Sequence, residues 1–409
     1  MIDVHEIGTV IRKVRMERNI KQLELAKLIK CTPSALSKFE RQELNLEQDK
    51  IDTLMDKLGI AYEDIPSILE RIEEEKDITL LVFLGIESSV KQNLLLDGDY
   101  AEFNRQLTFI NHPLLETYLR GKRFFKTKSF DNAAKHYQTV IDAVQDDLST
   151  KVNLKSAAYL DLGIIAYESN EYSKMFDCYD QGIKHFNHAG ERQHILYNLH
   201  YNKALSLHDS GEITEGSKTD IALEPAWQNR SKIDDFLTEI KVHQLKASLK
   251  MNSGKTREAR IILQEALIIA NANRSADGAY YVLVDLAKLA SQKGQVALSE
   301  ETYLSAIRFA DKLVYARATS AYLGISRLYL SQGDVKNAKK HIVNGLKCAN
   351  KHNAHKQIQA RMLHGEILEA DGNAYDASKQ YKEAKKLAHK YGLNQYKASL
   401  YESLFRCQN

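Results

Sequence analysis

Apolar residues recur along this chain with the spacing of amphipathic helices. Residues 21–40 contain two such short patterns, whose apolar positions are Leu23, Leu25, Ala26 and Leu28 in the first and Ala35, Leu36 and Phe39 in the second. Lys30-Cys31-Thr32 separates the two patterns; Thr32 is a good N-cap, and Pro33 suits the first position of a helix. The stretch therefore predicts two short helices around a tight turn.

The second of these helices has an outward side of small, polar and cationic residues. Ser34, Ser37 and Lys38 lie on that side, opposite the apolar positions. A helix with an apolar back and such a front suits the major groove of DNA.

This segment resembles the helix-turn-helix of the phage-repressor (XRE) type over roughly residues 5–60. The resemblance implies that Gln22 contacts a phosphate and that Ala26 lets the two helices approach. It also implies that Arg15 pairs with Glu40. Pro33 departs from the family, in which a polar base-reading side chain is common at this position. We therefore expect DNA contacts from Gln22, Thr32, Ser34, Ser37 and Lys38, while a helical hairpin that binds no nucleic acid is the alternative.

From about residue 110 the pattern repeats every 39 to 43 residues. Small residues recur in the middle of a first helix, at Gly121, Gly163, Ala204, Ala247, Ala287, Ser326 and Gly365. A glycine follows seven positions later in the last five units, at Gly211, Gly254, Gly294, Gly333 and Gly372, and Lys128 and Asn170 take this place in the first two. This is the tetratricopeptide (TPR) pattern with lengthened helices. The sequence predicts an all-α protein in which a helix-turn-helix head precedes a right-handed TPR solenoid.

Residues 61–77 join the two parts. Pro66 interrupts the chain after the head, and Ile68, Leu69 and Ile72 form one apolar stripe on an acidic helix. We therefore expect a DNA-binding head over residues 1–60, a linker helix over 61–77, and a TPR domain for peptide binding and dimerisation over 78–409.

Composition agrees with a helical protein of more than one domain, because 409 residues include four prolines. The net charge of +3 excludes binding to nucleic acid through overall charge alone, so the head is expected to work through placed contacts and as a homodimer. The four scattered cysteines are typical of reduced cytosolic thiols, and no apolar run approaches 18 residues. We expect a cytoplasmic protein with no membrane partner.

Enzyme signatures are weak. Ser253-Gly254-Lys255-Thr256 ends like a phosphate-binding loop, but Leu249 stands where the first glycine is required, and Gly254 is in register with the turn glycines. We therefore expect no catalytic residue, no metal and no cofactor.

A TPR solenoid offers the first helix of each repeat to a concave groove that suits a peptide. With the small residue of each first helix counted as position 8, positions 2, 5, 6, 9 and 12 face that groove. The peptide-binding candidates are Lys122, Asp161, Asn198, Tyr201, Asn202, Lys241, Gln244, Tyr281, Asp285, Lys288 and Arg327. Asn198 and Asn202 share one helical face, and their amides can hold a peptide backbone. The cations suit a terminal carboxylate or an acidic side chain.

The head, linker helix and TPR body together resemble the RRNPP family of peptide-pheromone receptors from Gram-positive bacteria. The resemblance implies a transcriptional regulator whose groove binds a short signalling peptide and thereby alters the binding of a dimer to operator DNA. The segment NLHYNKA, residues 198–204, is similar to the backbone-holding helices of that family. Two alternatives remain, a Rap-like protein that binds a response regulator and a TPR scaffold that does not bind DNA.

Overall fold

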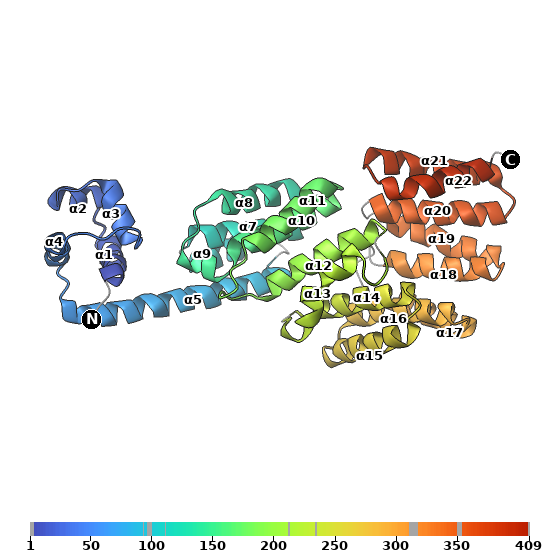
Figure 1. The fold of residues 1–409 in the computed structure, drawn as a ribbon, viewed down its shortest axis with the longest axis horizontal. Helices are drawn as coiled ribbons and strands as arrows, with labels where there is room; N and C mark the ends of the chain where they lie inside the picture. The colour runs from blue at the N-terminus through green and yellow to red at the C-terminus, as the bar shows by residue number, and fades with distance from the viewer. Residues whose placement is uncertain are drawn as a thin grey trace. The chain divides into compact units, whose positions relative to one another are not determined.

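The computed structural model describes residues 4–92, 94–95, 100–110, 112–211, 213–233, 235–310, 318–349 and 354–407. Every regular element within these ranges is a helix, which confirms the all-α prediction. The chain divides into two compact units, residues 1–122 and 123–409, which are described separately (Figure 1).

The first unit contains the head and the helices that follow it. Its helices are α1 (Val4–Glu17), α2 (Gln22–Leu28), α3 (Pro33–Glu40), α4 (Gln48–Leu58), a 3-10 turn (Tyr62–Asp64), α5 (Ile65–Lys91), α6 (Tyr100–Leu107) and α7 (Pro113–Lys126), whose last residues belong to the second unit.

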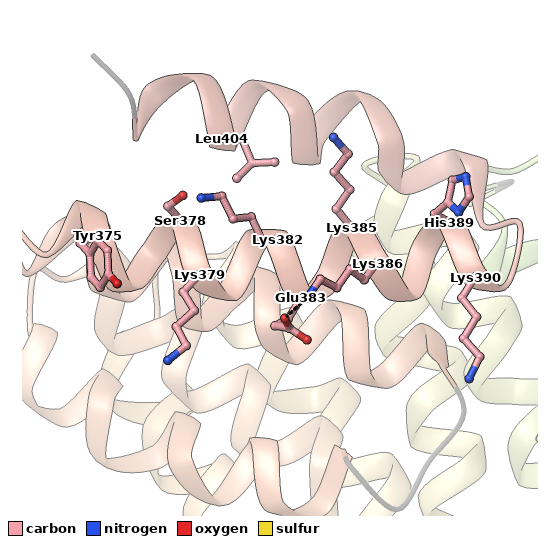
Figure 2. Close-up of a pocket in the computed structure, with 10 residues that line it drawn as sticks. All are labelled: Tyr375, Ser378, Lys379, Lys382, Glu383, Lys385, Lys386, His389, Lys390 and Leu404. Carbon is pink, nitrogen blue, oxygen red and sulfur yellow. Dashed lines mark hydrogen bonds and ion pairs between the residues drawn. The ribbon is translucent and has the colours of Figure 1, made fainter.

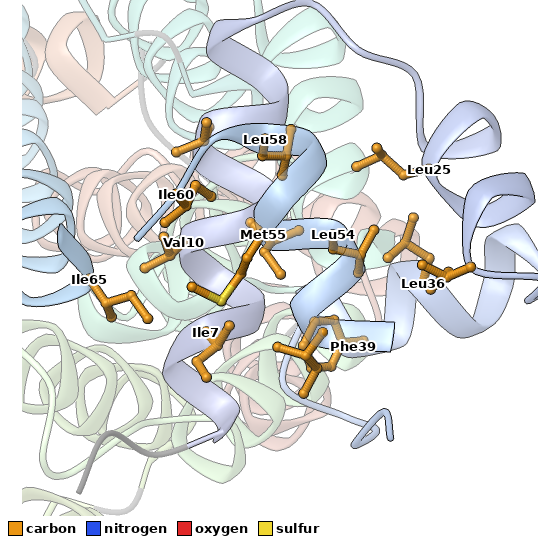
Figure 3. Packing of buried hydrophobic residues seen from close by; sticks show 14 of the residues in the cluster. Ile7, Val10, Leu25, Leu36, Phe39, Leu54, Met55, Leu58, Ile60 and Ile65 are labelled. Atoms are coloured by element: carbon orange, nitrogen blue, oxygen red, sulfur yellow. The ribbon is translucent and has the colours of Figure 1, made fainter. Parts of the chain in front are cut away.

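The core of the head is formed by α1 to α4 together with the start of α5 (Figure 3). Its buried side chains include Ile7, Leu36, Phe39 and Ile65. A Cβ atom at Gly8 would lie 2.3 Å from the carbonyl oxygen of Phe39. Glycine is therefore required at this approach of α1 to α3, and the crossing fixes the position of α3 on the core.

The linker helix differs in its bounds from the predicted 61–77. It begins at Ile65 after the 3-10 turn and continues to Lys91, so the expected boundary at residue 78 falls inside α5. Pro66 lies in the first turn of α5, where its missing N–H costs no hydrogen bond. Residues 78–91 contain no proline and continue the buried positions, for example at Phe83 and Val90, so nothing ends the helix earlier.

The second unit consists of successive helix pairs joined by short connections (Figure 1). The pairs are α10 (Leu154–Glu168) with α11 (Tyr172–Lys184), α12 (His194–Asp209) with α13 (Lys218–Gln228), α14 (Phe236–Asn252) with α15 (Thr256–Ala272), α16 (Ala276–Gln292) with α17 (Val296–Ala310), α18 (Thr319–Ser331) with α19 (Val335–Ala349), and α20 (Ala354–Ala370) with α21 (Ala374–Lys390). Outside these pairs lie α8 (Phe130–Asp142), α9 (Asp147–Lys151), two 3-10 turns (Arg230–Lys232 and Asn394–Tyr396) and α22 (Lys397–Arg406).

The turns within the repeats have the backbone that the sequence predicts. All five turn glycines have positive φ, as at Gly254 with 75° and Gly372 with 77°. Lys128 and Asn170 have φ of 59° and 62°, so they adopt the same left-handed conformation at the equivalent positions. Gly254 is thus a repeat turn, which agrees with its place in the register.

The small residues lie where helices cross closely. A Cβ atom at Gly163 would lie 2.4 Å from the ring of Tyr179, and one at Gly365 would lie 2.4 Å from the ring of Tyr381. The corresponding Ala204 and Ala247 are fully buried. The repeat pattern therefore predicted the points of closest packing in the solenoid.

Candidate functional site

The helix α3 presents the polar face that the sequence predicts. The hydroxyl of Thr32 accepts a hydrogen bond from the backbone N–H of Ala35 at 3.1 Å, which caps the helix. Leu36 and Phe39 are buried in the head core. Among the DNA-binding candidates of this region, Thr32, Ser34 and Lys38 are exposed and Ser37 is half-buried.

The apolar side of α2 was predicted only in part. Leu25 and Ala26 are buried, as expected, but Leu23 and Leu28 are 52% and 44% exposed. The buried stripe instead continues to Ile29, one turn after Leu25. A helix of seven residues offers one narrow face to α3 and α4, so Leu23 and Leu28 fall outside that face.

A buried ion pair fixes the end of α3, and this prediction is confirmed. Glu40 is 2% exposed, and its carboxylate accepts hydrogen bonds from Nε of Arg15 at 2.6 Å and Nη2 at 2.9 Å. Nε2 of Gln22 donates to the same carboxylate at 2.6 Å. Gln22 therefore has a partner within the chain, and a phosphate would have to compete with Glu40 for its amide.

In the second unit, hydrogen bonds connect the predicted groove residues from one first helix to the next. Oδ1 of Asn198 on α12 accepts from the hydroxyl of Thr238 on α14 at 2.9 Å. Nε2 of Gln244 on α14 donates to Asp285 on α16 at 2.6 Å, and Lys288 pairs with Asp285 at 2.7 Å. Repeat counting thus brought together residues that lie on neighbouring first helices.

Asn202 is placed one helical turn after Asn198, as predicted. Its Nδ2 donates to the backbone carbonyl of Asn198 at 2.8 Å, while no hydrogen bond to its Oδ1 occurs among the described residues. Burial raises the pKa of the neighbouring Tyr201 far above its usual value, and Tyr281, Asp209 and Asp285 add to the effect. Tyr201 therefore stays neutral and can donate a hydrogen bond.

The other peptide-binding candidates have varied surroundings. Asp161 is 3% exposed on α10, Lys241 and Tyr281 are half-buried, and Arg327 is exposed. Lys122 belongs to the first unit, where its Nζ lies 5.8 Å from the ring centroid of Tyr118.

Sequence reasoning missed two charged residues beside this groove, Asp209 and Lys356. Burial would raise the pKa of Asp209, but its hydrogen bonds with His208 and Tyr167 and the charge of Lys356 outweigh burial, so the pKa is lowered. The hydroxyl of Tyr167 donates to Asp209 at 2.5 Å. Burial lowers the pKa of Lys356, although the charges of Asp209 and Asp285 oppose this. The groove therefore contains both signs of charge in a partly desolvated place.

These two residues come together where the early and late repeats of the second unit meet. Oδ1 of Asn170 accepts a hydrogen bond from the backbone N–H of Ala354 at 2.8 Å, and Nε2 of Gln395 donates to the carbonyl of Asp209 at 3.4 Å. The rings of Tyr172 and His355 lie 5.0 Å apart, edge to face. We call this region the seam. It borders a cavity of about 340 Å³ whose lining includes these side chains.

The repeat register explains why the seam was missed. Asp209 is at position 13 of its repeat, one residue beyond the positions that were counted, and Lys356 precedes position 1 of its own. A pattern within one repeat carries no information about contacts between repeats that are 184 residues apart. The charges themselves were the available signal.

Other kinds of site were also considered. No three His, Cys, Asp or Glu side chains in the described ranges are grouped as a metal ion would require. None of the helices in the described part of the chain combines the length and the apolar character needed to cross a membrane.

The head matches a known family in sequence. Residues 11–65 match the family model HTH_3, described as Helix-turn-helix. No curated protein matches the chain in sequence.

Several solved structures resemble the chain. The structure of NprR in complex with its cognate peptide NprX is 13% identical, with a TM-score of 0.57 over 83% of this chain and 99% of that one. The apo form of the quorum sensor NprR from B. thuringiensis is 12% identical, with a TM-score of 0.49 over 83% and 99%. Bacillus thuringiensis PlcR in complex with the peptide PapR7 and DNA is 15% identical, with a TM-score of 0.26 over 76% and 95%.

The chain is therefore a helix-turn-helix protein whose larger part has the helical-repeat fold of NprR. This is the architecture of the RRNPP regulators, so the resemblance seen in the sequence is confirmed at the level of the fold.

Proposed function

We propose that this chain is a peptide-responsive transcriptional regulator. Its head binds operator DNA, and its solenoid binds a short signalling peptide that alters this binding. The observation that supports the proposal most is a capped helix α3 with an exposed polar face, in one chain with first helices whose amides and charges line one groove.

The DNA-bound form is proposed to be a homodimer. A single head offers one short recognition helix, and the head has few placed cations, so two half-sites are needed for a specific complex. Exposed apolar residues on α5, Ile78 at 61% and Leu81 at 68%, support an interface between two copies along this helix.

Lys38→Ala should weaken operator binding by about 1–3 kcal/mol if Lys38 contacts a base edge, and less if it contacts a phosphate. The side chain is exposed on α3, so its removal leaves the head core intact. The measurement is a fluorescence titration at fixed salt with a duplex that the wild-type chain selects from a random library, and we expect two protomers per duplex.

Lys57→Ala is the matched control, because Lys57 is an exposed lysine on α4. It should change the affinity far less than Lys38→Ala. Equal losses in the two variants would remove Lys38 from the recognition surface. A wild-type chain that selects no duplex but binds peptide would be a TPR scaffold.

The groove suits a peptide that carries both an amide backbone and charge. Asn198, Asn202 and Gln244 supply amides, and the buried tyrosines supply an apolar wall. Lys288 and Lys356 can meet a carboxylate, while Asp209 and Asp285 can meet an ammonium group. A peptide that bridges several first helices would change the distance between repeats, because each repeat contacts mainly its neighbours.

Asn202→Ala should weaken peptide binding about tenfold, because a side-chain amide that holds a backbone unit is lost. Binding is measured by calorimetry with a heptapeptide selected on the immobilised wild-type protein from a random library. The DNA affinity of the peptide-free variant should equal that of the wild type, and saturating peptide should shift the wild-type DNA affinity by about 1–3 kcal/mol.

Asn273→Ala is the control for local helix effects. Nδ2 of Asn273 also donates to a backbone carbonyl four residues earlier, at 2.9 Å, but Asn273 ends the second helix of its repeat. It should bind the peptide like the wild type. Undiminished affinity in Asn202→Ala would exclude the proposed contact, and a DNA affinity indifferent to peptide would exclude the switch.

A further inference from the structure

The C-terminal helices carry a concentration of positive charge that the groove and the head do not explain. Residues 375–409 contain seven Lys/Arg and three Asp/Glu, whereas the whole chain has a net charge of +3. The remaining residues therefore have a net charge of −1. Positive charge on this chain is concentrated in its last helices.

Four of these lysines form one exposed row on α21, at Lys379, Lys382, Lys386 and Lys390. Spacings of three and four residues place them on one side of the helix over roughly 16 Å. They border an open pocket of about 800 Å³ between α21 and α22. Figure 2 shows Lys382 directed toward α22 and Lys379 and Lys390 directed away from it, so the row covers a broad surface. We call these four residues the lysine row.

Internal contacts do not neutralise the lysine row. Lys386 pairs with Glu383 at 2.8 Å, but the two side chains are 75% and 44% exposed, so the pair is weak. Nζ of Lys390 lies 4.9 Å from the centroid of the Tyr391 ring. Neither Lys379 nor Lys382 forms an ion pair with another described residue. The row is available to an external anion.

The residue types favour a nucleic-acid backbone over a protein or a membrane. Lysine is depleted from protein interfaces, whereas its flexible stem and compact charge suit phosphates, which need no fixed geometry. A helix that lies in a membrane surface needs a free apolar face. The apolar face of α21, including Tyr381 and Ala384, is buried in the solenoid.

We infer that the lysine row binds the phosphate backbone of double-stranded DNA without regard to sequence. DNA is the polyanion that the helix-turn-helix head would bring to this chain, so the row adds a second, electrostatic contact to the same ligand. The row acts on affinity for any duplex, whereas the head discriminates between sequences.

The test replaces all four lysines by glutamine, K379Q/K382Q/K386Q/K390Q, in the full chain. The probe is a 30-base-pair duplex of random sequence, followed by fluorescence anisotropy at several salt concentrations. Each phosphate contact contributes about −0.9 to the slope of log K against log salt, so the slope should become shallower by about 3. Binding at low salt should weaken at least tenfold.

A second variant, K184Q/K232Q/K293Q/K347Q, removes the same charge from exposed lysines dispersed over the second unit. It should retain the wild-type slope. An unchanged slope in the lysine-row variant would overturn the inference, and so would an equal loss in both variants, since overall charge would then explain the binding. Loss of binding to anionic vesicles with unchanged DNA binding would overturn it in favour of a membrane surface.

The result is distinguishable from a failure of the head to bind an operator. The lysine-row variant should keep the wild-type ratio of affinities for selected and random duplexes, because the row does not read bases. Lys38→Ala should lower that ratio and leave most of the salt dependence of random-duplex binding in place.

Discussion

Glu40→Ala should destabilise the head by about 3 kcal/mol and abolish DNA binding with it. The substitution leaves the guanidinium of Arg15, whose side chain is 12% exposed, without the carboxylate that now accepts two of its N–H groups. Gln22 loses its partner at the same time. A buried charge that has lost its counterion costs far more than the intact pair contributes, which explains the size of the effect.

Amide hydrogen exchange in α1 to α4 measures this loss within the head itself. The slowest amides of these helices should exchange about 100-fold faster in Glu40→Ala. Glu43→Ala is the control, because Glu43 forms an exposed pair with Arg41 at 3.1 Å and should change stability by less than about 0.5 kcal/mol. Lost DNA binding with normal exchange would instead assign Glu40 a direct role at the DNA.

Gly365→Ala should destabilise the solenoid by about 1–3 kcal/mol, although alanine is the better helix former. The new Cβ atom would lie 2.4 Å from the ring of Tyr381. That ring is fully buried, and its hydroxyl donates to Glu369 at 2.9 Å, so it cannot move aside. The helices α20 and α21 must therefore separate. The fluorescence of Trp227, the single tryptophan, during urea unfolding reports the loss.

Gly345→Ala tests the same substitution where the neighbour can yield. Its Cβ atom would lie 3.2 Å from a terminal methyl group of Leu323, which can rotate away. This variant should be about as stable as the wild type or slightly more stable, because glycine in a helix interior costs up to about 1 kcal/mol relative to alanine. Equal stabilities of the two variants would show that the crossing at Gly365 does not limit packing.

Local requirements made much of this molecule predictable from its sequence. A left-handed turn, a helix cap or a close crossing restricts the residue at one position, and that restriction remains visible in the sequence. Lys128 and Asn170 show the strength of the repeat register, because both adopt positive φ where the later repeats have glycine. Arg15 and Glu40 were paired through the family resemblance and are found bonded.

Features that depend on long-range packing were not predictable in this way. The exposure of Leu23 depends on which side of α2 meets the rest of the head, and the end of α5 depends on packing beyond residue 78. Asp209 and Lys356 approach only because distant repeats meet, so no periodicity within a repeat marks them. The groove was therefore predicted for its amides and for part of its charge.

The seam also affects how the chain can be synthesised and folded. In an open array, each repeat can fold on its predecessor as it leaves the ribosome. Here Asn170 is bonded to Ala354, which lies 184 residues later. At 5–20 residues per second, the early repeats wait roughly 10 to 40 s for this partner. During that interval Tyr172 and its neighbours remain uncovered, so the nascent chain exposes a surface that the finished protein closes.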